Sequence, residues 1–342
     1  MDKGLTGLSN LGNTCFLNAC IQALNHTHEL IQLKKTYDPF IRSSVSDSII
    51  LREYEELRNV MMENNGVVSP NKFVHNVHLI AKEKGREIFT GWAQNDITEF
   101  LLFMIDCIHN SISRGINVII SGKIEHSTDE LAKHCYAMTK EVYAKEYSEI
   151  METFNGIYVS EIWSMDGKTR HSIKSEMFFV LDIPIPTFSD RTTTIYDCFD
   201  TFTEPEILEG ENAWYNEKTN QMEDIRKRII FWNFPKVVVV SLKRFSTDGQ
   251  HKITQLVDFP IHTLDLSKYV AGYNASSYVY ELYAVCNHMG GVHGGHYTAF
   301  AKRPNDDWFH YNDTQVEKVE NPQNVITPMA YCLFYRKKNG AI

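Results

Sequence analysis

Residues 7–26, GLSNLGNTCFLNACIQALNH, change character at Cys15. Before the cysteine, Gly12 and Asn13 are turn-forming residues that tolerate unusual backbone angles. After it, apolar side chains recur with the spacing of one helix face, at Phe16, Ala19, Cys20, Ala23 and Leu24. We therefore predict a loop that becomes an amphipathic helix at Cys15.

A cysteine in the first turn of a helix has two interpretations. Unpaired backbone N–H groups and the helix dipole favour the thiolate there, which suits a nucleophile. The alternative is a small buried apolar residue, the commonest environment of a cysteine. Position alone favours the structural alternative for Cys15, so a catalytic role requires a partner, which is usually a histidine.

The composition narrows the class of protein. The chain has 342 residues, a net charge of −9 and seven scattered cysteines. The acidic balance argues against nucleic-acid and anionic-membrane binding, and the cysteine pattern favours a reducing compartment over a disulfide framework. The sequence contains neither a signal peptide nor an apolar run of membrane-spanning length. We therefore expect a soluble cytoplasmic or nuclear protein.

The pattern along the chain changes near residue 150, from helical periodicity to short runs of β-branched and aromatic residues. Further helices are predicted over residues 46–62, from Asp96, and over 127–151, and Ser69-Pro70 is predicted to start another. Strands are predicted over residues 157–163, 177–183, 236–245, 278–287, 296–302, 308–311 and 331–336. This order predicts an α+β fold with a cleft where the two parts meet.

His296 is the histidine whose surroundings single it out. Four glycines precede it in the run MGGVHGGH, and a predicted strand follows. In the hairpin expected next, pairing Lys302 with Asp306 would place Asn312 opposite His296, and a one-residue shift would place Asp313 there. Either side chain could orient the imidazole as a catalytic base. The alternative is a solvated hairpin whose polar residues are incidental.

Five blocks in fixed order resemble the ubiquitin-specific proteases, which are cysteine peptidases. The blocks are GLSNLGNTCFLN (7–18), QNDITEFL (94–101), LKRF (242–245), GGHYTA with WFHYND (294–313) and AYCLFY (330–335). The resemblance extends over nearly the whole chain. It implies one catalytic domain, residues 1–342, with a papain-like α+β fold shaped like a right hand. The helical thumb would be about 1–150, and the palm and fingers 151–342, with the fingers about 153–265.

The activity implied by the resemblance is that of a deubiquitinating thiol hydrolase. It would cleave the (iso)peptide bond after the C-terminal Gly-Gly of ubiquitin through a thioester acyl-enzyme. Ubiquitin or ubiquitinated proteins would be its partners, without nucleic acid, membrane or cofactor, and the protein would be monomeric. The alternatives are the same chemistry on a ubiquitin-like modifier, and a catalytically silent ubiquitin-binding scaffold.

The resemblance also implies roles for individual residues. Cys15 would be the nucleophile and His296 the base that later returns a proton to the leaving amine. Asn312 would hold the imidazole, with Asp313 as an alternative or helper. Asn10 would stabilise the oxyanion together with the Cys15 backbone N–H.

Four further residues would line the channel for the ubiquitin tail: Gln94, Asp96, Gly294 and Gly295. Asp96 would suit a basic residue of the tail, would cap its own helix, or would do both. The two glycines would let the tail pass close to the backbone.

The chain departs from the family pattern at the fingertips. Many members bind a structural zinc there through two CxxC pairs. The corresponding stretches here, residues 163–167 and 215–219, contain no cysteine, so we expect no metal. A smaller departure is Asn95, which stands where the family usually has a second glutamine.

Overall fold

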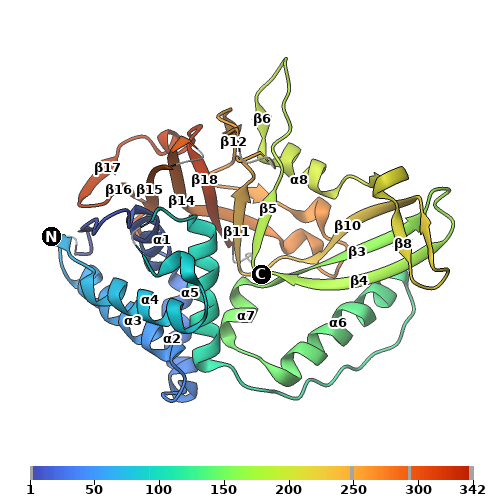
Figure 1. The fold of residues 1–342 in the computed structure, drawn as a ribbon, viewed down its shortest axis with the longest axis horizontal. Coiled ribbons are helices and arrows are strands. Elements are labelled where there is room, and N and C mark those ends of the chain that lie inside the picture. Colours follow the sequence, from blue (N-terminus) through green and yellow to red (C-terminus); the bar gives the residue numbers. More distant parts are fainter. Residues whose placement is uncertain (1–2, 92, 247–249, 292–293, 339–342) are drawn as a thin grey trace.

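The structure is a computed structural model that describes residues 3–91, 93–246, 250–291 and 294–338. Figure 1 shows most of the early helices gathered on one side of the molecule and a long sheet reaching away on the other. The α-helices of the described part are α1 (Cys15–Asn25), α2 (His28–Tyr37), α3 (Asp47–Glu63), α4 (Asn71–Glu83), α5 (Ile97–Ile112), α6 (Ser127–Lys145), α7 (Glu149–Phe154) and α8 (Ile195–Thr203). None of them is long and apolar enough to cross a bilayer.

Two large sheets follow the helices. The central sheet has the spatial order β17 (Gln315–Val319), β16 (Trp308–Asn312), β15 (Gly294–Lys302), β14 (Val279–Gly291), β18 (Ala330–Lys337), β11 (Val237–Leu242) and β5 (Val180–Ile183), with β13 (Leu264–Asp265) beside β14. The finger sheet has the order β4 (Arg170–Phe178), β3 (Gly156–Ser164), β10 (Ile225–Asn233) and β7 (Glu206–Leu208). Three short pairs complete the described strands: β1 (Thr6–Leu8) with β2 (Gly66–Val68), β6 (Thr193–Thr194) with β12 (Val257–Asp258), and β8 (Trp214–Asn216) with β9 (Gln221–Glu223).

The central sheet separates two hydrophobic cores. In β11, Val237 and Val239 belong to the core that α1 to α5 share with one face of the sheet. Val238 and Val240 belong to the core on the other face, which includes α8. All four valines are 0% exposed, as expected for a strand that is covered on both faces, and they lie within the predicted strand over 236–245.

Helix α1 is buried at every position, including its polar ones, so it is a core helix rather than a surface helix. It lies against β15, the strand that carries His296. Gln22 supports this burial because its side-chain amide donates to the Thr6 carbonyl at 2.8 Å. The residue predicted to open the helix, Cys15, is its first residue.

Several predicted elements differ from those observed. The predicted helix over 127–151 is two helices, α6 and α7, with a break at residues 146–148. The predicted strand over 177–183 spans the junction between β4 and β5 at Phe179. The helix predicted to start at Ser69-Pro70 starts at Asn71, with Pro70 in the cap position. Helices α2 and α8 and strand β10 were not predicted, because charged and polar residues interrupt their apolar patterns.

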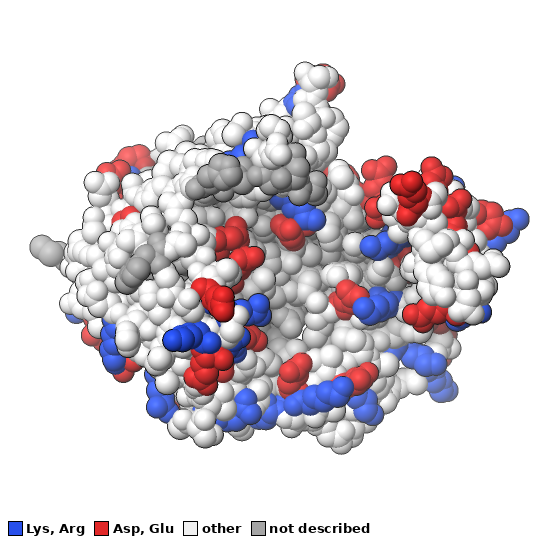
Figure 2. All heavy atoms as spheres, in the orientation of Figure 1, with Lys and Arg blue, Asp and Glu red and all other residues white. Residues whose placement is uncertain are grey.

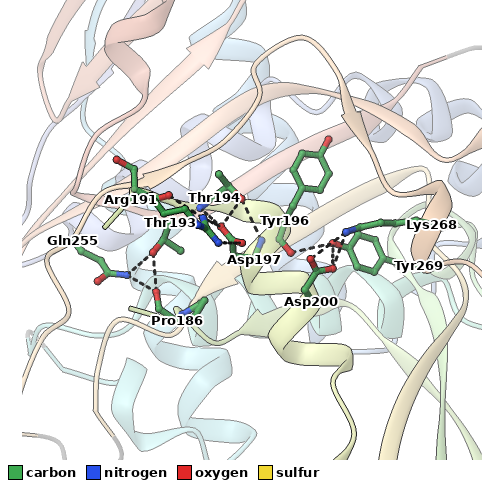
Figure 3. A network of polar contacts seen from close by, with 11 residues as sticks. Pro186, Arg191, Thr193, Thr194, Tyr196, Asp197, Asp200, Gln255, Lys268 and Tyr269 are labelled. Carbon is green, nitrogen blue, oxygen red and sulfur yellow. Dashed lines mark hydrogen bonds and ion pairs between the residues drawn. The ribbon is translucent and has the colours of Figure 1, made fainter. Parts of the chain in front are cut away.

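The loop between β5 and β6, residues 184–192, projects beyond the central sheet (Figure 1). Hydrogen bonds hold its base, as Figure 3 shows: Thr193 Oγ1 and Gln255 Nε2 each donate to the Pro186 carbonyl at 2.8 Å. The Arg191 guanidinium donates to both oxygens of Asp197, in the first turn of α8, at 2.7 Å each. The base of the loop is therefore fastened to α8 while its tip extends outward.

Candidate active site

Cys15 lies at the meeting point of the helical part and the central sheet. Its side chain is 2% exposed, and its thiol hydrogen-bonds with the backbone of Tyr297, the residue after His296. The loop before it has the backbone that the sequence suggested, because Gly12 and Asn13 have φ angles of 107° and 55°.

The electrostatics of Cys15 differ from the prediction that the helix N-terminus favours the thiolate. Burial raises the pKa of the thiol, and the nearby carboxylate of Asp313 raises it further. Backbone hydrogen bonds with Tyr297 and Phe16 lower the pKa, but they do not outweigh burial. Burial thus holds the pKa of this thiol above its ordinary value, and a nucleophilic role would need a base.

His296 has its orienting partner in Asn312. The imidazole Nε2 lies 2.7 Å from the Asn312 side-chain oxygen Oδ1. A carbonyl oxygen only accepts hydrogen bonds, so Nε2 carries the proton and Nδ1 of the neutral ring has the free lone pair. That lone pair is what a base acting on Cys15 requires.

The hairpin that carries these residues has neither of the two predicted registers. Lys302 pairs with Trp308, and Ala299 pairs with Tyr311, so the ladder continues to Asn312 at the level of Thr298. The connecting loop has five residues, 303–307. Asn312 is therefore the diagonal neighbour of His296 on the same face, and its side chain still reaches the imidazole.

Asp313 does not take part in the His296–Asn312 pair. Its φ of 49° turns the chain away from β16. Its carboxylate accepts hydrogen bonds from Asn10 Nδ2 at 3.0 Å and from Asn18 Nδ2 at 2.8 Å. Asp313 therefore ties the loop before Cys15 and helix α1 to the end of the hairpin.

Asn18 is a residue of this site that the sequence reasoning missed. It lies on α1, one turn after Cys15, and is 3% exposed. The available signal was a polar residue in a mainly apolar helix, because a polar side chain buried there requires a hydrogen-bond partner.

Asn10 shapes the loop before the nucleophile. Its Oδ1 accepts from the backbone N–H groups of Gly12 at 3.0 Å and Thr14 at 3.1 Å. One N–H of its side-chain amide donates to Asp313, and an amide has two such hydrogens. The second N–H remains for another acceptor.

The residues predicted to line a tail channel lie together across the junction. The side chain of Gln94 donates to the Gly295 carbonyl at 2.7 Å and accepts from the Gly295 N–H at 2.6 Å. A Cβ on Gly294 would lie 2.9 Å from the Gln94 oxygen, and its φ of 155° also favours glycine. Asp96 caps α5 through Thr98 and accepts from the Tyr331 hydroxyl at 2.6 Å.

A pocket of about 340 Å³ opens between these groups. It is lined by Gln94, Asn95, Asp96, Phe245, His288, Gly291, Gly294 and Tyr297. An elongated substrate segment could approach Cys15 through it.

Comparison with known families agrees with this arrangement. The family model described as "Ubiquitin carboxyl-terminal hydrolase" matches residues 6–335. The chain belongs to this family. Ubiquitin carboxyl-terminal hydrolase 2 of Bos taurus is 33% identical, with 97% of this chain and 55% of the relative covered. Usp2 of Drosophila melanogaster is 31% identical, with 98% and 35% covered. The chain thus spans about half the length, or less, of these two relatives.

Solved structures share the fold of this ubiquitin hydrolase family member. A chain of the SAGA DUB module Ubp8/Sgf11/Sus1/Sgf73 bound to monoubiquitin aligns with a TM-score of 0.71 at 23% identity, covering 99% of this chain and 70% of that chain. The same module bound to ubiquitin aldehyde gives a TM-score of 0.73 at 22% identity, with the same coverage of both chains. The α+β, papain-like, right-hand fold is confirmed.

The fingertips of this family member are closed by polar side chains. At the β8–β9 turn, Asn216 accepts from the Lys218 N–H at 3.0 Å, and Asn216 and Thr219 both donate to Glu223. At the β3–β4 turn, Asp166 accepts from Ser164 and from a backbone N–H. Among the described residues no group of three His, Cys, Asp or Glu side chains could hold a metal ion.

Proposed function

We propose that the protein is a cysteine-type deubiquitinase that cleaves the (iso)peptide bond after the C-terminal Gly-Gly of ubiquitin. The observation that carries this proposal is the His296–Asn312 pair, together with a cysteine at the start of a buried helix whose thiol bonds to the backbone of Tyr297, the residue after His296. Family membership supports it, as do the ubiquitin-bound structures that share the fold.

In the proposed mechanism Nδ1 of His296 removes the proton from the Cys15 thiol. The sulfur attacks the carbonyl carbon of the last ubiquitin residue, and the collapsing intermediate expels the lysine amine, which takes the proton from His296. A water molecule that gives its proton to His296 then attacks the thioester, releasing ubiquitin and the thiol. Asn312 keeps the imidazole in the required tautomer throughout.

The oxyanion of each tetrahedral intermediate would be stabilised by the free N–H of Asn10 and by the Cys15 backbone N–H. One such donor contributes about 3 kcal/mol of barrier reduction. Asp313 and the two backbone bonds to Asn10 Oδ1 hold this side chain in position. A preoriented donor costs little reorganisation when the charge develops.

The ubiquitin tail would enter beside Gln94 and Asp96 and pass over Gly294 and Gly295. Both Asp96 oxygens already accept hydrogen bonds, and their remaining lone pairs would suit a basic tail residue. The globular part of ubiquitin would rest against the fingers, where Asp and Glu gather around β8 (Figure 2). Residues 204–211 alone contain four exposed glutamates, and this surface would suit a basic partner face.

The remaining parts of the proposal concern the domain, its assembly and its location. We propose one catalytic domain over residues 1–342, with its thumb over about 1–150 and its fingers within 153–265, acting as a monomer without a metal. The cytoplasm or nucleus is the proposed compartment. All seven cysteines are buried free thiols, which suits a reducing environment.

The test is a covalent probe. Ubiquitin with an electrophilic C-terminus should form an adduct with the wild-type protein and with Cys20→Ala, a matched cysteine in the same helix, but not with Cys15→Ala. An adduct that survives Cys15→Ala would move the nucleophile elsewhere. If the wild type reacts with a ubiquitin-like probe but not with the ubiquitin probe, the proposed substrate would be a ubiquitin-like modifier instead of ubiquitin. Failure with both would favour a silent scaffold.

A further inference from the structure

A second recessed surface lies at the end of β15 remote from His296. It is bordered by α2, the β15–β16 loop, the residue before β11 and the end of β18, and it has a volume of about 780 Å³. Its basic lining residues are Lys236, Lys302, Arg303, Arg336, Lys337 and Lys338. Its acidic ones are Glu29, Glu281 and Asp306. This basic hollow therefore has a positive excess in a chain whose net charge is −9.

Two of the cations form ion pairs with all three carboxylates. Lys302 pairs with Glu281 at 3.3 Å and with Asp306 at 2.7 Å. Arg336 pairs with Glu29 at 3.1 Å. The other four cations of the hollow have no carboxylate partner among its lining residues.

The four cations without a carboxylate partner could contact a bound anion. Lys236 is exposed and makes no ion pair or hydrogen bond through its side chain to the residues that the structure describes. Lys337, Lys338 and Arg303 donate only to neutral oxygens of a serine side chain and of backbone carbonyls. One guanidinium nitrogen of Arg303, Nη1, is buried without a partner. Like charges held this close repel one another, so a bound anion would stabilise the hollow.

An aromatic hollow of about 280 Å³ continues the basic one. Lys236 and Lys337 line both hollows, so the two adjoin, and together they are called the groove. The walls of the aromatic hollow include Tyr136 and Tyr143 of α6, and Trp232. Tyr136 is 38% exposed and meets the indole of Trp232 edge to face at 5.7 Å.

We propose that this groove docks an acidic peptide segment of a partner protein. Its Asp and Glu side chains would lie in the basic hollow, and an adjacent apolar side chain would enter the aromatic hollow. Two connected hollows of different character fit an extended segment better than a compact anion, and the charges are complementary. The basic hollow alone, at about 780 Å³, lies in the range of roughly 300–1,000 Å³ that is usual for ligand sites.

The groove is separate from the proposed active site, so this inference goes beyond the proposed function. It shares no lining residue with the pocket beside Gln94. Lys302 is six residues along β15 from His296, roughly 20 Å at ~3.3 Å per residue. A partner could therefore bind while the catalytic cleft is occupied.

The test uses the full chain and a fluorescein-labelled peptide, EDEEFLDEE, in an anisotropy titration at low salt. We expect saturable binding, and Cys15→Ala should retain it. The double variant Lys236→Glu with Lys338→Glu should bind at least roughly tenfold more weakly, and added salt should also weaken binding. The matched control is Lys82→Glu with Lys123→Glu, two exposed lysines outside the groove, and it should bind as the wild type does. Tyr136→Ala should weaken this peptide but not EDEESSDEE.

Four results would overturn the proposal. The first is that the wild type shows no saturable binding of the peptide, and the second is that the Lys236→Glu, Lys338→Glu variant binds it as tightly as the wild type does. The third is that the control pair of substitutions weakens binding equally. The fourth is that a peptide with Gln and Asn in place of its acidic residues binds equally well. If tripolyphosphate binds at the groove and the peptide does not, the ligand of the groove would be a small anion rather than a peptide, which would also overturn the proposal. If the variant with both lysines changed to glutamate does not fold, Lys236→Gln with Lys338→Gln takes its place in the titration. Hydrolysis of a fluorogenic ubiquitin substrate should be unchanged in the groove variants, which separates this test from that of the proposed function.

Discussion

Adjacent residues at the end of β16 have different partners and different chemistry. Asn312 is neutral and bonds to His296, whereas Asp313 is an anion that bonds to Asn10 and Asn18. Because Asp313 lies near the thiol, it raises the pKa of Cys15 in addition to the larger effect of burial. Replacing Asp313 with asparagine would keep the shape of the side chain and remove its charge. The substitution would therefore separate the effect of the charge on the Cys15 thiol from the position of the side chain.

We predict that Asp313→Asn lowers the pKa of the Cys15 thiol, because it removes a negative charge that disfavours the thiolate. The midpoint of the pH profile for alkylation by iodoacetamide should move to lower pH. Asp307→Asn, at the far end of the same hairpin and paired with Lys318, should leave the midpoint unchanged. A midpoint that stays in place or rises in Asp313→Asn would contradict this account.

Among the elements, the finger sheet depends on a buried charge. Glu161 on β3 is 3% exposed and accepts from Trp163 at 3.0 Å, from Arg170 on β4 at 3.1 Å and from Arg228 on β10 at 2.8 Å. Burial alone would raise the pKa of Glu161, but the hydrogen bonds from Trp163 and Arg228 outweigh it and the pKa is lowered. One carboxylate thus joins three strands.

We predict that Glu161→Gln destabilises the protein at pH 7 by about 2 kcal/mol, since it leaves partly buried arginines without their anion. A lowered folded-state pKa contributes stability above the ordinary glutamate pKa, about 4.3, and that contribution is lost as the pH falls through the folded value. The difference in the free energy of unfolding between Glu161→Gln and the wild type should therefore shrink below about pH 4. Urea unfolding at pH 7 and about pH 3 measures the free energy of unfolding of both proteins.

The control for this prediction is Glu206→Gln, an exposed finger glutamate on β7. It should change the free energy of unfolding by less than about 0.5 kcal/mol at either pH. Equal stability of Glu161→Gln and wild type at pH 7 would refute the role assigned to Glu161.

At the scale of the whole molecule, the proposed catalysis requires the helical part and the central sheet to keep their relative position. Cys15 belongs to one and His296 to the other. Gln94 joins them a short distance away, because its amide bonds to both backbone groups of Gly295. This contact holds the residue directly before His296.

We predict that Gln94→Ala increases hydrogen exchange of the Gly295 amide and lowers the free energy of unfolding by about 1 kcal/mol per lost bond. Amide exchange measured by NMR or mass spectrometry checks the first effect. Gln94→Glu keeps an acceptor for the Gly295 N–H and should preserve most of its protection. Unchanged exchange in Gln94→Ala would show that other contacts hold the two parts.

Elements with strong local signals could be predicted, and others could not. The helix at Cys15 and the valine strand β11 have unbroken patterns, and both were predicted. His26 lies in a polar stretch of sequence, yet it is 5% exposed, since it bonds to Gln22 of α1 and faces Tyr311 of β16. A contact between residues so far apart in sequence leaves no periodic trace in either segment.

The amino-acid sequence by itself determined the family blocks and their order, and with them the fold, the cysteine and the histidine. Only the tertiary structure decided that Asn312, rather than Asp313, hydrogen-bonds to His296. The length of the β15–β16 loop sets the register of the hairpin, and the residues of the loop are compatible with more than one register. Only the tertiary structure showed that the Cys15 pKa is raised, because burial sums over segments distant in the chain. The same holds for the basic hollow, whose charges come from five separate parts of the chain.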